Sequence, residues 1–180
     1  KLTYTTLASV VKYPADSLRG FDKSRLATKK SGFMHSEAPF FKEIAAELGI
    51  PGKEEVYVRH PFVYLVEAAD DICCRVIDLE DAFKLKVVSF REVLELLLPL
   101  FDSSPLKAYL ENKLRSISDE EQQLSLLRAL LINHLTQLCT EVFLANEEAL
   151  LNGSLNDSLI DLLPEPLQQH LRQVNEFSVK

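Results

Sequence analysis

The side chains that could do chemistry together are concentrated between Arg59 and Asp81. The acids in this otherwise apolar stretch include Glu67, Asp70, Asp71, Asp78 and Asp81. On a helix, Asp70, Cys74 and Asp78 recur every four residues, so two carboxylates and a thiol would share one face. A carboxylate in an apolar wall is costly unless a cation or hydrogen-bond donors compensate it, and a divalent metal ion is one common solution. This face is therefore a candidate binding site.

The same acids allow a plainer interpretation. They could pair with Arg59, Arg75 or Lys84, or they could face solvent as an ordinary charged surface. The spacing alone leaves both interpretations open. Other nucleophile and ligand motifs are absent, because the sequence has no Gly-rich phosphate loop, no His-Glu-x-x-His and no Cys-x-x-Cys.

The elements that must position these residues are expected to be helices. Leu is the commonest apolar residue and runs of β-branched residues are short, so the fold class is predicted to be all-α. Apolar periodicity, prolines and glycines predict helices over 2–13, 36–48, from 60 to at least 79, from 89, from 105, over 118–152 and over 167–177. Residues 15–36 are predicted to form a long polar loop.

Two of these helices carry a start signal in which a Ser is followed three residues later by a Glu. Ser89 with Glu92, and Ser118 with Glu121, fit the capping-box pattern. The helix that begins at Ser118 is the longest expected element and would be the central one. The helix from Pro61 is the least amphipathic of the set, which predicts that it is the most buried.

Composition and charge limit the class of protein. With 47% hydrophobic and 26% charged residues in 180, the chain fits one soluble domain, and no internal boundary is evident in 1–180. No apolar run approaches the roughly 20 residues of a membrane span, so no membrane partner is expected. The three cysteines, an odd number with two of them adjacent, favour a reducing compartment such as the cytoplasm.

The net charge of −7 provides no general attraction for a polyanion. A local basic patch in the long loop, made of Lys23, Arg25, Lys29 and Lys30, is either a solvated surface or a contact for nucleic acid or a regulatory nucleotide. His134 and Asn133, in the long helix, are interpreted as local polar contacts or as a contact in a homo-oligomer. Cys73 and Cys139 fall on apolar faces and are expected to be small core residues.

Three motifs in order resemble a known family. Glu-Ala-Ala-Asp-Asp-Ile at 67–72, followed by Asp-Leu-Glu-Asp at 78–81, resembles the deoxyguanosinetriphosphate triphosphohydrolase family of HD-domain phosphohydrolases. The helix at 2–14 that ends in Lys-Tyr-Pro and the Lys-x-Gly-Phe-x-x-Ser-Glu segment at 30–37 are similar to further motifs of that family. The ordered motifs cover 2–83, and beyond them the sequence shows only compatible helices. The resemblance implies an HD-domain-like helical bundle segment.

The resemblance also implies an activity and a set of residue roles. The reaction would convert a dNTP substrate into deoxynucleoside and tripolyphosphate, with a divalent metal ion, Mg²⁺ or Mn²⁺, as cofactor. Asp70 would be a metal ligand, and Asp78 would contact the sugar. Lys12 would contact the triphosphate, with Tyr13 beside it. These residue types suit those roles, since Lys binds phosphate as a point charge and a carboxylate accepts from a sugar hydroxyl.

Two departures from the family pattern accompany the match. Cys74 stands where the family commonly has Tyr, which alters the sugar contact and with it the substrate preference. No His-Asp dipeptide occurs in the chain, so the other metal ligands and the catalytic His and Glu are expected upstream of Lys1. No catalytic residue is then expected in the chain itself, which would be an inactive fragment of a longer, oligomeric enzyme. The alternative is a non-catalytic helical scaffold or oligomerisation module with the same fold.

Overall fold

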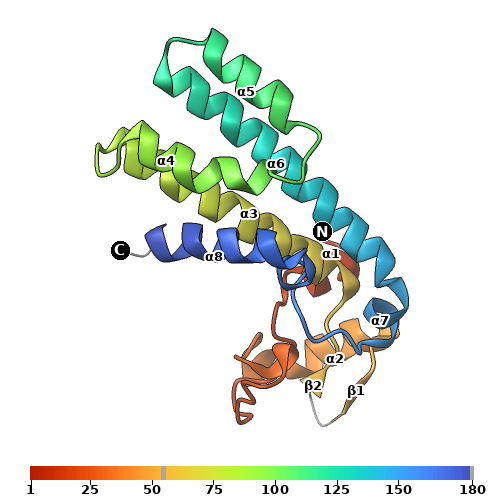
Figure 1. The fold of residues 1–180 in the computed structure, drawn as a ribbon. Helices are drawn as coiled ribbons and strands as arrows, with labels where there is room; N and C mark the ends of the chain where they lie inside the picture. The colour runs from red at the N-terminus through yellow and green to blue at the C-terminus, as the bar shows by residue number, and fades with distance from the viewer. Residues whose placement is uncertain (54–55, 179–180) are drawn as a thin grey trace. The chain divides into compact units, whose positions relative to one another are not determined.

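The computed structural model describes residues 1–53 and 56–178, and Figure 1 draws the helices and strands in chain order. The chain forms two compact units. The first consists of Lys1–Ala68 with Val142–Leu159, and the second of Ala69–Glu141 with Ile160–Lys180. The fold is predominantly α-helical, as the sequence predicts.

The described elements follow a simple order. The α-helices are α1 (Tyr4–Val10), α2 (Ala38–Glu47), α3 (Pro61–Lys84), α4 (Phe90–Leu97), α5 (Lys107–Ser116), α6 (Glu120–Ala145), α7 (Glu147–Asn152) and α8 (Glu165–Ser178). Short 3₁₀ helices are η1 (Leu26–Thr28), η2 (His35–Glu37), η3 (Leu98–Phe101) and η4 (Ile160–Leu162), and one antiparallel pair of strands joins β1 (Gly52–Lys53) to β2 (Val56–Tyr57). The sequence predicts no strands at this position, because each strand is only two residues long.

The core of the first unit is an aromatic cluster beside α2. Phe33 stacks on Phe41 with ring centroids 4.6 Å apart, and Tyr57 meets Phe41 edge-on at 5.2 Å. Phe33 comes from the end of the long loop, so this cluster anchors the loop to the helix. The helix α2 ends where predicted, because Gly49 adopts a φ of 65°, a conformation that residues with a Cβ rarely adopt.

The second unit buries the leucine-rich faces of its helices. The helices α4, η3 and α8 pack against one another. The fully buried side chains of this unit include Leu79, Val93, Phe101, Leu110, Leu127 and Leu131. Figure 1 shows α5 and α6 side by side. The Gln123 side-chain amide joins them by donating to the Leu114 and Ile117 carbonyls at 2.8 and 2.5 Å.

Helix boundaries differ from the prediction in three places. The first helix stops at Val10, so Lys12 and Tyr13 lie in the bend that follows it rather than in the helix. The long helix is capped by Asp119, whose carboxylate accepts from the Gln122 amide at 2.8 Å, and not by Ser118. It breaks at Asn146, and α7 continues to Asn152 before Gly153. The predicted capping box of Ser89 and Glu92 is confirmed.

The prediction that the helix from Pro61 is the most buried is wrong. Several apolar side chains of α3 are largely open to solvent, with Phe62 48%, Val66 46% and Ile77 44% exposed. α3 therefore carries apolar side chains on its exposed side as well as on its buried side. Among the described residues, no helix is both long and apolar enough to cross a lipid bilayer.

Candidate functional site

Two lysines from separate segments lie near the Tyr13 ring in the first unit. The Lys12 ammonium is 5.9 Å from the ring centroid and the Lys30 ammonium is 6.0 Å from it. Both distances are at the outer limit of a cation–π contact. Both cations therefore lie near one aromatic ring on a chain of net charge −7, and cations that are held near one another attract anions.

Lys12 is held at both its backbone and its side chain. Its ammonium lies 2.9 Å from a Glu67 carboxylate oxygen, and its carbonyl accepts from the Arg59 Nε at 2.9 Å. Arg59 in turn lies 2.8 Å from the other Glu67 oxygen and 4.6 Å above the Tyr64 ring. Arg59 and Glu67 are both buried, whereas about a third of the Lys12 side chain is open, at 36%. The Lys12 side chain therefore remains partly exposed while the buried Glu67 and Arg59 hold it in place.

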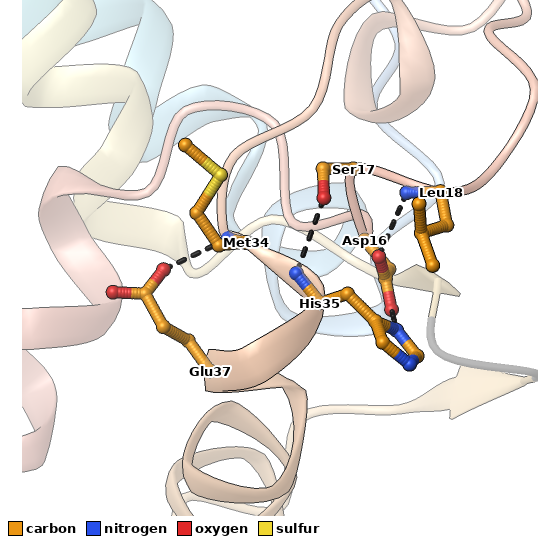
Figure 2. Close-up of polar contacts among 6 residues, drawn as sticks. All are labelled: Asp16, Ser17, Leu18, Met34, His35 and Glu37. Carbon is orange, nitrogen blue, oxygen red and sulfur yellow. Dashed lines mark hydrogen bonds and ion pairs between the residues drawn. The ribbon is translucent and has the colours of Figure 1, made fainter.

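The loop that carries Lys30 is closed at its base by polar contacts (Figure 2). The buried Asp16 carboxylate lies 2.6 Å from His35 Nδ1. The His35 amide donates to the Ser17 hydroxyl at 3.1 Å, and the Met34 amide donates to Glu37 at 2.8 Å. The two contacts of His35 join the start of the loop to its end.

The α3 face predicted from the sequence is present and open. Asp70, Cys74 and Asp78 are all exposed. The Cys74 thiol lies 3.5 Å from Asp70 Oδ1 and donates to it. This hydrogen bond is the main reason why the pKa of Cys74 is raised, with the Asp70 charge adding to it. The thiol is thus held protonated, as a neutral donor rather than a thiolate nucleophile.

Other acids of α3 follow the plainer, ion-paired interpretation. Glu80 is buried and pairs with Arg128 and with Lys84, the latter at 2.7 Å. Hydrogen bonds from these two cations lower the pKa of Glu80 against the opposing effect of burial. The spacing argument did not single out Glu80, although it turns out to be a buried acid, whereas Asp70 and Asp78 are exposed.

The described residues do not form a complete metal centre. No group of three or more His, Cys, Asp or Glu side chains in residues 1–53 and 56–178 is arranged to hold an ion. His134, in the second unit, has a local role: it stacks on Phe101 at 5.6 Å and lies 3.5 Å from the Ser104 hydroxyl. Burial lowers the pKa of His134. All three cysteines are free, and Cys139 is buried as predicted.

Sequence reasoning missed several residues that the structure brings together. The sequence predicts Arg59 and Glu67 only as members of possible ion pairs, and it places Lys30 in the basic patch and in the motif at 30–37 without linking it to Tyr13. The signal for Lys30 was its position in the Lys-x-Gly-Phe motif, two residues before Gly32. The contact between Asp16 and His35 had no signal, because it joins residues 19 positions apart through an irregular loop.

Comparisons with known proteins agree on one family. No family model matches the chain. A protein of Pseudomonas aeruginosa named deoxyguanosinetriphosphate triphosphohydrolase-like is 36% identical over 167 residues, which cover 92% of this chain and 37% of that protein. A protein of the same name from Listeria monocytogenes is 34% identical over 89% of this chain and 35% of its own length.

A protein of Yersinia pestis named deoxyguanosinetriphosphate triphosphohydrolase is 29% identical over 89% of this chain and 34% of its own length. The chain therefore spans little more than a third of the length of these curated relatives. The matched region extends well beyond the motifs at 2–83 and includes most of the later helices. Over about nine-tenths of its length, the chain is thus a relative of proteins named as deoxyguanosinetriphosphate triphosphohydrolases, which confirms the resemblance seen in its motifs.

Proposed function

We propose that this chain is a segment of a metal-dependent dNTP triphosphohydrolase that supplies one metal ligand together with contacts to the triphosphate and the sugar. The observation that carries the proposal is the pair of lysines near the Tyr13 ring, because Lys12 and Lys30 come from two separate family-like motifs and lie 5.9 and 6.0 Å from the centroid of that ring. The dGTP triphosphohydrolase names of the relatives support the class of reaction.

At the phosphate end, Lys12, Lys30 and Tyr13 would act by charge and hydrogen bonding. Each ammonium neutralises part of the triphosphate charge, and the phenol hydroxyl of Tyr13 donates to a phosphate oxygen. Glu67 and Arg59 would hold Lys12 in place before the substrate arrives, so little side-chain entropy is lost on binding. The described contacts therefore favour a preorganised anion site.

At the sugar end, Asp78 and Cys74 would contact the deoxyribose. A carboxylate accepts from a sugar hydroxyl, and the protonated thiol of Cys74 fills less space than the Tyr common in the family. A smaller side chain leaves more room beside the sugar, so substrate preference is the property that Cys74 would change.

Asp70 would be the metal ligand that this chain contributes. Its carboxylate is exposed, and hard oxygen donors suit Mg²⁺ or Mn²⁺. One carboxylate does not fix a divalent ion, so we propose that the remaining ligands belong to a part of the protein outside these 180 residues. When bound, the ion would supply charge neutralisation at the phosphates and a more acidic water molecule.

The wider assignments complete the proposal. Residues 1–180 would form part of one larger domain, in a cytoplasmic protein, in keeping with three free cysteines. We also predict that the protein forms a homo-oligomer. The basic patch at 23–30 is predicted to be either a solvated surface or a contact for nucleic acid or a regulatory nucleotide.

Steady-state hydrolysis of dGTP by the full-length protein tests the proposal. We expect tripolyphosphate release with Mg²⁺ or Mn²⁺, and a loss of about 2 to 4 kcal/mol of transition-state stabilisation, in kcat/KM for every dNTP, in Lys12→Ala. Lys113→Ala is the matched control, because Lys113 also lies 5.9 Å from a tyrosine ring, that of Tyr109 in α5. Absence of hydrolysis, or equal effects of the two substitutions, would support the scaffold alternative.

A further inference from the structure

Asp16 is a buried acid at the base of the loop that carries Lys30. It is only 1% exposed, and it receives two donors. Oδ2 lies 2.6 Å from His35 Nδ1, and Oδ1 accepts from the Leu18 amide at 2.8 Å (Figure 2). A buried carboxylate that loses such a donor is strongly penalised, so these contacts hold the two ends of the loop in one arrangement.

Backbone hydrogen bonds also connect the two ends of the loop. The Ser17 amide donates to the Phe33 carbonyl at 3.1 Å, and the Gly32 amide donates to the Ala15 carbonyl at 3.0 Å. The His35 amide closes the set by donating to the Ser17 hydroxyl at 3.1 Å. Hydrogen bonds therefore join residues 15–17 to residues 32–35, and Asp16 and His35 form the side-chain pair between these segments.

These hydrogen bonds fix the position of the backbone that carries Lys30. Gly32, two residues after Lys30, passes so close to Tyr13 that a Cβ at position 32 would lie 2.0 Å from the Tyr13 carbonyl oxygen. The backbone at Gly32 therefore passes in close contact with the backbone of Tyr13. The Lys30 ammonium reaches the Tyr13 ring, 6.0 Å from its centroid, from this anchored backbone.

We propose that Asp16 and His35 are positioning residues that hold Lys30 beside Tyr13 and so set the strength of triphosphate binding. Neither residue needs to touch the substrate, since both act through the backbone that carries Lys30. The inference rests on the proposed role of Lys12, Lys30 and Tyr13 as the phosphate contacts.

Calorimetric titration of the full-length protein with tripolyphosphate tests the inference through a double-mutant cycle. Lys30→Ala, Asp16→Asn and His35→Leu should each weaken binding by about tenfold. Asp16→Asn combined with Lys30→Ala should be no weaker than Lys30→Ala alone, because a positioning residue has no effect once the side chain it positions is gone. His35→Asn, which retains a donor near the place of Nδ1, should restore most of the affinity lost in His35→Leu.

Asp22→Asn is the matched control, because Asp22 lies in the same loop and its side chain accepts from the Ser24 hydroxyl at 2.6 Å and from the Ser24 amide at 3.0 Å. It should leave tripolyphosphate affinity unchanged. The inference, but not the proposed phosphate site, would be overturned by unchanged tripolyphosphate affinity in both Asp16→Asn and His35→Leu. Losses of affinity that add fully to that of Lys30→Ala would overturn it in the same way. Unchanged affinity in both Lys12→Ala and Lys30→Ala would overturn the proposed phosphate site, and the inference with it.

Discussion

Glu67 shows how one buried charge can serve both stability and the candidate site. Its two carboxylate oxygens lie 2.9 Å from the Lys12 ammonium and 2.8 Å from Arg59. Arg59 is 3% exposed, so it depends on Glu67 for its counter-charge. Removal of one member of a buried pair costs more than the pair contributes, because the other charge stays buried without compensation.

Glu67→Ala should therefore destabilise the protein by about 3 to 5 kcal/mol, measured by urea unfolding. Glu95→Ala is the control, since Glu95 also pairs with an arginine, Arg91 at 2.9 Å, but both side chains are mostly exposed. That change should stay within about 0.5 kcal/mol. Similar losses in the two variants would mean that the Arg59 contact does not carry the expected charge compensation.

Asp78 is expected to act on the sugar rather than on the phosphates. Asp78→Asn keeps the shape but turns an acceptor-only group into a mixed donor and acceptor. The ratio of kcat/KM for dGTP to that for GTP should change by about tenfold, with a smaller change in kcat for dGTP. Asp81→Asn alters another exposed acid of α3 and should leave this ratio unchanged; a shift of the same size there would remove the assignment of Asp78.

His134 links stability to pH. Burial lowers its pKa in the folded state, so as pH falls the unfolded chain takes up the proton first, near pH 6.5. The contribution of neutral His134 is complete above about pH 6.5 and is lost as the pH falls through the lower folded-state pKa. His134→Gln should therefore gain stability relative to the wild type between pH 7.5 and pH 5 in urea unfolding, whereas a constant difference would contradict this account.

At the scale of elements, helix starts were the most predictable features. Ser89 and Glu92 form the predicted capping box, and prolines 39, 61 and 166 each lie in the first turn of a helix. These signals are local, so a single sequence contains them. The sequence does not predict the short strand pair 52–53 and 56–57, because two residues per strand are too few for an alternating pattern.

The start of α6 offers a direct test of local reasoning. The Ser118 to Glu121 pattern predicts a Ser cap, but the Gln122 amide bonds to the Asp119 carboxylate at 2.8 Å. Asp119→Ala should cost about 1 kcal/mol in thermal or urea unfolding, whereas Ser118→Ala should stay within about 0.5 kcal/mol. The reverse order would restore Ser118 as the cap.

At the scale of the whole molecule, the candidate site was only partly accessible to sequence reasoning. Helical periodicity places Asp70, Cys74 and Asp78 on one face, and the structure shows that all three are exposed rather than set in an apolar wall. The contacts of Lys12 with Glu67 and of Lys30 with Tyr13 join residues 55 and 17 positions apart and needed the fold. Other side chains of α3, such as Phe62 and Ile77, are apolar and exposed as well.

The central claim is that this chain contributes one ligand, Asp70, to a metal centre completed elsewhere in the protein. The most direct measurement is Mn²⁺ binding by calorimetry to the full-length protein, to its Asp70→Asn and Asp71→Asn variants, and to residues 1–180 alone. We expect tight Mn²⁺ binding by the wild type and a loss of affinity of about tenfold or more in Asp70→Asn. The loss in Asp71→Asn should be milder, because Asp71 points about 100° away on the helix. Residues 1–180 alone should bind Mn²⁺ only weakly. Equal affinities in Asp70→Asn and the wild type, or tight binding by residues 1–180 alone, would contradict the account.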